Sequence, residues 1–148
     1  MLFLVAVLVA ASIVDIRCFR LPDWLTLPLV VVGLALAAAG GRGELPGRVL
    51  AAGVGFLVFA ALAALYRLRR NSNGLGLGDA KLLAAAGAWL GPWYLAPTVF
   101  AGALLALGFV LILRLRGQTI TSATVVPFGP FLSAAFFGFW CLKTAGWP

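Results

Sequence analysis

Histidine is absent from this 148-residue chain, and cysteine occurs only twice, at Cys18 and Cys141. Without histidine and without a Cys-x-x-Cys pair, the sequence lacks the usual ligands of a zinc site, so we expect neither a metal nor a cofactor. Charge is scarce as well, because only 10% of the residues are charged, against about 25% in an ordinary soluble domain. Any chemistry must therefore come from carboxylates, hydroxyls, lysines or arginines.

Apolar residues make up 64% of the chain and fall in long runs separated by short polar gaps. Too few charged side chains remain to cover a soluble globule, so lipid is the expected solvent. The composition and length predict a single all-α membrane domain over residues 1–148 with about six transmembrane helices. The expected spans are residues 2–16, 24–39, 49–66, 80–93, 95–113 and 128–142.

Proline and glycine mark the expected breaks between these spans. Pro22 is expected to end the first helix, and Asp23 then stands in a good position to cap the second. Gly91 and Pro92, followed by Pro97, interrupt the region in which the fourth span must turn into the fifth.

The net charge of +7 has a topological meaning in a membrane protein. Basic residues are enriched in cytoplasmic loops, where they also contact anionic lipid. We therefore expect both termini to face outward, and no nucleic-acid partner, because no basic stripe is interleaved with exposed aromatic residues. The group assigned to the cytoplasmic side is Arg17, Arg20, Arg67, Arg69, Arg70, Lys81, Arg114 and Arg116, and the opposite group is Arg42, Arg48 and Lys143.

The chain has only four acidic residues, and two of them stand in unusual places. Asp15 lies inside the first apolar run, and Asp79 follows the glycine-rich segment 74–78 at the start of the fourth. The first span runs inward and the fourth outward, so both carboxylates are expected at the same depth near the cytoplasmic surface. Two carboxylates around one water form the arrangement of an aspartic protease. Asp23 is more simply a helix cap, and Glu44 a solvated loop charge.

Structural alternatives remain open for each candidate residue. Asp79 alternatively caps the fourth helix, and Asp15 alternatively pairs with Arg17 or Arg20 near the membrane surface. Lys81 is either an anchor on the cytoplasmic side or a contact for substrate.

Three segments resemble the motifs of the type IV prepilin peptidase family, a branch of the GxGD intramembrane aspartyl proteases. They are Asp-Ile-Arg-Cys-Phe-Arg-Leu-Pro-Asp-Trp-Leu-Thr at 15–26, Gly-Leu-Gly-Asp-Ala-Lys-Leu-Leu at 76–83 and Val-Pro-Phe-Gly-Pro at 126–130. The resemblance implies a GxGD-type helical bundle in which Asp15 and Asp79 are catalytic. The residues that it implies in substrate binding or motif support are Gly76, Gly78, Lys81, Pro22, Asp23, Pro127 and Gly129.

The same resemblance implies a function and a location. The expected activity is cleavage of the leader peptide of prepilin-like precursors, at the cytoplasmic face of a bacterial or archaeal inner membrane. The expected partner is a precursor with a hydrophobic N-terminal helix, cut just before that helix and typically after glycine. Longer family members carry a cytoplasmic domain with paired Cys-x-x-Cys motifs associated with N-methylation. This chain resembles the short, peptidase-only form.

Two other functions fit the carboxylates. A membrane transporter or assembly scaffold uses intramembrane acids for proton or ion handling, and a presenilin-like peptidase acts on other membrane substrates.

For the peptidase we expect Asp79, at a helix N-terminus, to be the base. Asp15, near a helix C-terminus, is then the proton donor, although the two titrate as a coupled pair.

Overall fold

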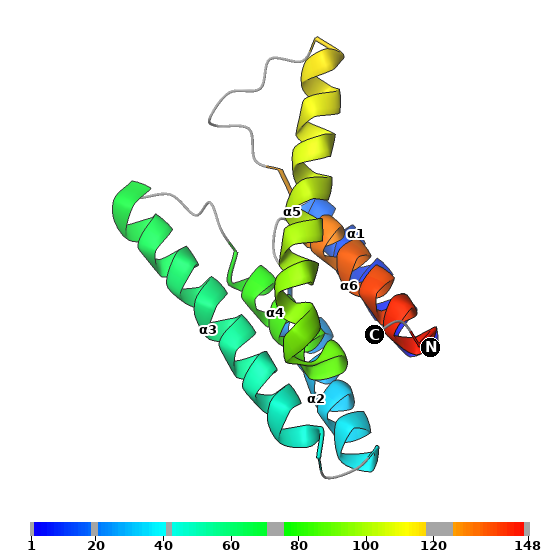
Figure 1. Cartoon of the computed structure of the whole chain (residues 1–148). Coiled ribbons are helices and arrows are strands. Elements are labelled where there is room, and N and C mark those ends of the chain that lie inside the picture. The colour runs from blue at the N-terminus through cyan, green and yellow to red at the C-terminus, as the bar shows by residue number, and fades with distance from the viewer. Residues whose placement is uncertain (1, 19–20, 41–42, 71–75, 118–125, 147–148) are drawn as a thin grey trace.

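The computed structural model describes residues 2–18, 21–40, 43–70, 76–117 and 126–146. Its described residues form six helices, shown in Figure 1, and the prediction of an all-α protein is confirmed. The helices are α1 Leu2–Cys18, α2 Asp23–Ala39, α3 Leu45–Arg70, α4 Leu77–Leu90, α5 Pro92–Leu115 and α6 Gly129–Thr144.

Helix α4 lies at the centre of the bundle and contacts α2, α3, α5 and α6. Every residue from Ala80 to Leu90 except Lys81 is buried, because this stretch is rich in alanine and four other helices pack around it. The crossing with α3 is close: a Cβ added to Gly87 would lie 2.6 Å from the backbone carbon of Ala51. Small residues at such crossings let two helix backbones approach.

The helix bounds differ from the expected spans most clearly around α4. The fourth span was expected at 80–93, whereas α4 is Leu77–Leu90. It ends there because Gly91 has a positive φ of 90° and Pro92 begins the next helix. The expected break at Pro97 is wrong, because α5 continues through this residue.

Two helices, α3 and α5, are long and apolar enough to cross a membrane by length and composition, and α2 is apolar but shorter. Large apolar side chains are exposed on these helices, as at Phe100 and Leu107 of α5, which are 66% and 65% exposed. The helices and the composition are those of a helical membrane protein. Six membrane crossings stay a prediction.

Most of the described basic residues lie at one end of the bundle, which we call the basic end. Here α1, α3 and α5 end, and α2, α4 and α6 begin (Figure 1). The predictions for Arg20 and Arg42 lie outside the described residues, as do residues 74 and 75 of the glycine-rich segment 74–78. The residues at the basic end are Arg17, Arg67, Arg69, Lys81, Arg114 and Arg116, and those at the other end are Arg48 and Lys143.

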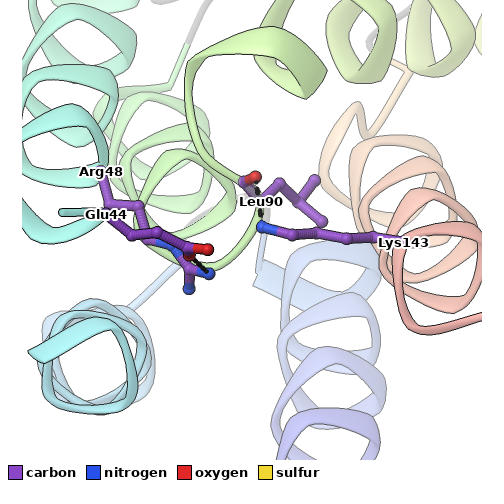
Figure 2. Close-up of polar contacts among 4 residues, drawn as sticks. All are labelled: Glu44, Arg48, Leu90 and Lys143. Carbon is purple, nitrogen blue, oxygen red and sulfur yellow. Dashed lines mark hydrogen bonds and ion pairs between the residues drawn. The ribbon is translucent and has the colours of Figure 1, made fainter. Parts of the chain in front are cut away.

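Polar contacts also hold the opposite end (Figure 2). Lys143 on α6 donates a hydrogen bond of 2.8 Å from its Nζ to the carbonyl oxygen of Leu90, the last residue of α4. Glu44 and Arg48 form an ion pair across the first turn of α3. The hydrogen bond and charge of Arg48 lower the pKa of the Glu44 carboxyl. The carboxylate is exposed, as expected for a solvated charge.

Candidate active site

Asp15 lies on α1, one turn before this helix ends, and only 6% of it is exposed. Its Oδ2 accepts a hydrogen bond of 3.0 Å from the backbone N–H of Gly129, the first residue of α6. The approach is so close that a Cβ on Gly129 would lie 2.6 Å from this oxygen. The alternative pairing of Asp15 with Arg17 is wrong in the described structure, where the ion pairs lie elsewhere. Pairing with Arg20 concerns a residue outside the described ranges.

Asp79 is buried in the first turn of α4, with 7% of the residue exposed. The residue that caps this helix is Gly76, which has extended backbone angles and whose carbonyl oxygen accepts a hydrogen bond from the Asp79 N–H. Among the described residues no side chain makes a capping hydrogen bond to this helix, and Asp79 lies inside its first turn, so the simpler interpretation of Asp79 as the N-cap is wrong. Its buried Oδ1 has no hydrogen-bond partner among the described residues. A buried carboxylate oxygen without a partner is costly and asks for an explanation.

The two carboxyl groups come together at one end of the bundle. Both are buried there, although they are 64 positions apart in the sequence. Their helices do not pack on one another within the described residues, because α1 contacts α2 and α6 while α4 contacts both of these helices. Asp15 and Asp79 therefore stand at the basic end on two helices that are linked through α2 and α6.

Gly78 occupies a position that a larger residue cannot fill. A Cβ placed there would lie 2.6 Å from the Cβ of Leu21 and 3.0 Å from its backbone nitrogen. In this structure the close neighbour of Gly78 is thus the segment between α1 and α2. Gly76 is different, because a Cβ there would make only ordinary contacts, the nearest side-chain atom being Oδ2 of Asp79 at 3.8 Å.

Asp23 and Lys81 form an ion pair that joins the start of α2 to the first turns of α4. The prediction that Asp23 caps α2 is wrong: Pro22 is the cap residue, with extended backbone angles, and no side chain makes a capping hydrogen bond. Asp23 is the first residue of the helix, and its carboxylate accepts the hydrogen bond of Lys81 instead. The pair is partly exposed, with Lys81 at 25% and Asp23 at 61%.

The segment before α6 carries the backbone N–H that binds Asp15. Pro127 is half-buried, and the ring of Phe128 stacks on Phe59 of α3 with 6.4 Å between centroids. One turn further on, Gly102 of α5 lies against the backbone of Leu132. Contacts with α3 and α5 therefore fix the position of Gly129.

Sequence reasoning did not single out three residues near this end of the bundle. Leu21 lies inside a quoted motif, but nothing local indicates that it contacts Gly78. Thr26 and Ser133 are buried, and their hydroxyl oxygens have no hydrogen-bond partner among the described residues. Thr26 ends the motif quoted at 15–26, but isolated hydroxyl residues in apolar helices are common, so nothing local indicates that either side chain is buried.

By its fold and site, this protein is a helical membrane bundle with two buried carboxyl groups at its basic end. The profile of the Type IV leader peptidase family matches residues 2–112, and the chain belongs to this family. The recognition made from the three sequence motifs is confirmed.

Named relatives extend the comparison over most of the chain. A prepilin leader peptidase/N-methyltransferase of Aeromonas hydrophila is 41% identical over 139 residues, covering 90% of this chain and 46% of the relative. Proteins of the same description in Burkholderia pseudomallei and Neisseria gonorrhoeae are 39% and 35% identical over 91% and 97% of the chain. They are covered over 45% and 48% of their own lengths, so the chain spans about half the length of the relatives it matches. No solved structure matches the chain significantly.

Proposed function

We propose that this protein is an intramembrane aspartyl endopeptidase that cleaves the leader peptide of prepilin-like precursors. The family membership and the printed function of the relatives support a leader peptidase. The observation that carries the aspartyl mechanism is the pair Asp15 and Asp79, two buried carboxyl groups at one end of the bundle. Pro22, Pro127 and the two glycines of the GxGD motif support the backbone around this pair.

The proposed reaction is acid–base hydrolysis of one peptide bond, without a covalent intermediate. One carboxylate takes a proton from a water molecule, and the water oxygen attacks the carbonyl carbon of the scissile bond. The other carboxyl group gives its proton to the carbonyl oxygen. As the C–N bond breaks, the first carboxyl group passes the proton taken from water to the leaving amine, and a hydroxyl of the tetrahedral intermediate returns a proton to the second. Two carboxylates that share a site keep one proton between them, which supplies both roles.

We assign the base to Asp79 and the acid to Asp15. Asp79 lies in the first turn of α4, where the helix dipole favours negative charge. Asp15 lies in the last turns of α1, where the helix dipole disfavours negative charge and so favours the protonated form. Carboxyl-resolved infrared titration tests the assignment. A protonated carboxyl band at neutral pH that survives only in Asp15→Asn would reverse the roles.

The location of the site follows from the basic residues. We propose six membrane crossings, with the basic end at the cytoplasmic face of a bacterial or archaeal inner membrane. The precursor then lies with its hydrophobic helix beside the bundle and its scissile bond near Asp15 and Asp79. No nucleic acid takes part in this proposal.

A cleavage assay tests the proposed function. The purified protein in detergent is incubated with a prepilin-type precursor, and mass spectrometry identifies the shortened product. Asp15→Asn and Asp79→Asn should each reduce the rate below detection while the unfolding temperature stays close to that of the parent. The matched control is Glu44→Gln, which removes a carboxylate at the opposite end and should cleave at the parent rate.

The same variants address the alternative function as a transporter or scaffold. A parent protein that leaves the precursor intact but moves protons or ions across a vesicle membrane, in a manner that depends on Asp15 and Asp79, would contradict the peptidase. An asparagine variant that cleaves at the parent rate would contradict the aspartyl mechanism alone.

A further inference from the structure

We infer that the ion pair of Asp23 and Lys81, together with the contact of Leu21 with Gly78, sets the separation of the two site carboxylates. We call these four residues the inner clamp. In this role Asp23 and Lys81 are positioning residues. The inference rests on the proposed function only for its effect on cleavage, because the positions of Asp15 and Asp79 can be measured without any reaction.

The inner clamp connects the two helices that carry the carboxylates. Asp79 stands between Gly78 and Lys81 in the first turns of α4, so both ties hold the turn that presents it. On the other side, Leu21 and Asp23 lie just before and at the start of α2, and α2 packs on α1. A shift of the start of α2 relative to α4 therefore also changes the position of α1.

Direct packing cannot set the separation, because α1 and α4 do not contact one another within the described residues. The position of α1 depends on its neighbours α2 and α6. The tie through α6 is the hydrogen bond from Gly129 to Asp15. The tie through the start of α2 is the inner clamp. Of the ion pairs in the described parts of the chain, only Asp23–Lys81 joins two helices, because Glu44–Arg48 lies within one turn of chain.

The Asp23–Lys81 ion pair is partly exposed, so its effect on the position of the site can be larger than its effect on folding stability. With Lys81 25% exposed and Asp23 61% exposed, water screens the attraction, and the pair contributes little to folding stability. Its geometric effect does not shrink in the same way, because a displacement of about 1 Å at a reacting group costs on the order of 100-fold in rate. Loss of the pair should therefore lower kcat much more than the unfolding temperature.

Exchange of the two charges tests the inference. Lys81→Asp and Asp23→Lys each place like charges side by side, and each should lower kcat about 10- to 100-fold with little change in KM. The double variant Asp23→Lys/Lys81→Asp restores an attractive pair and should recover most of the lost rate. If Lys81 contacted the substrate instead, the double variant would stay as slow as Lys81→Asp, and that result would overturn the inference.

A second measurement does not depend on catalysis. Asp15→Cys/Asp79→Cys, in a chain whose two native cysteines are replaced by serine, should form an intramolecular cross-link with a short bifunctional thiol reagent. Adding Lys81→Asp should lower the cross-linking yield, and exchanging both charges should recover it. An unchanged yield in the Lys81→Asp background would overturn the inference whether or not the parent protein cleaves a precursor.

The Glu44–Arg48 pair supplies the matched control. It is the other ion pair of the described residues, and it lies at the opposite end of the bundle. Glu44→Arg/Arg48→Glu and its two single variants should leave kcat and the cross-linking yield at the parent values. Equal losses from this pair would mean that any disturbed ion pair loosens the bundle, and the specific role of the inner clamp would be refuted.

Discussion

Substitution of Gly129 by alanine tests the geometry of the site at the atom where it is tightest. The new Cβ would lie 2.6 Å from Oδ2 and 2.9 Å from Cγ of Asp15. Contacts of Cβ atoms rarely fall below 3.0 Å and become ordinary from 3.4 Å. Since 3.0 − 2.6 = 0.4 and 3.4 − 2.6 = 0.8, the carboxylate must move by about 0.4–0.8 Å relative to α6.

This movement should damage catalysis much more than folding. The clashing atoms belong to the end of the Asp15 side chain, which can rotate, so the stability cost should stay near or below the ~1–3 kcal/mol typical of overpacked cores. The same displacement misaligns a reacting carboxyl group, for which ~1 Å corresponds to roughly 100-fold in rate. We expect kcat to fall about 10- to 100-fold, which equals about 1.4–2.8 kcal/mol of transition-state stabilisation.

The measurement is the initial rate of precursor cleavage, with the unfolding temperature in detergent recorded on the same preparations. The control is Gly138→Ala, because Gly138 lies on the same helix and a Cβ there would meet nothing within 4 Å. It should cleave at the parent rate. If Gly129→Ala also cleaves at that rate, the contact between α6 and Asp15 does not position a catalytic group, and the reasoning is refuted.

Further substitutions probe other contacts. Gly78→Ala should lower kcat at least 10-fold, because its Cβ would overlap Leu21 in the segment before α2. Gly76→Ala should lose less activity, because its Cβ would make only ordinary contacts. Initial rates of precursor cleavage compare the two variants. Gly87→Ala forces α4 away from the backbone of α3 and should cost about 1–3 kcal/mol of stability by denaturant titration, whereas Gly53→Ala, in open space, should cost nothing. Lys143→Met removes the donor to the last carbonyl of α4 and should cost about 0.5–1.5 kcal/mol in the same titration without slowing cleavage.

The apolar runs predicted the helices because each run is long enough to need a partner for every backbone polar group, and a helix supplies it. Their ends were harder to predict. The fourth span was expected to begin at residue 80, yet α4 already begins at Leu77 after the extended Gly76. At the other end a single residue, Gly91, separates α4 from α5. Its positive φ makes the sharp turn, which the sequence did not distinguish from a longer interruption.

The partners of the side chains in the candidate site were also hard to predict from the sequence. Local rules assigned Asp23 to a helix cap, because its sequence neighbours are those of a helix start. The structure gives its carboxylate to Lys81, which is 58 residues away in the sequence and is brought to α2 only by tertiary packing. The family resemblance implied Gly78 in substrate binding or motif support. Its close neighbour is Leu21 of the same chain.

The spacing of the two carboxylates is therefore a tertiary property that neither motif determines alone. Asp15 and Asp79 stand on helices that do not pack on one another, so their relative position is the sum of small contacts made by other residues. One such contact needs a glycine at 129 and another a glycine at 78, because a methyl group at either site would overlap its neighbour by several tenths of an ångström. Substitutions at these glycines should thus lower the rate while both acids are kept, because each moves one carboxylate relative to the other.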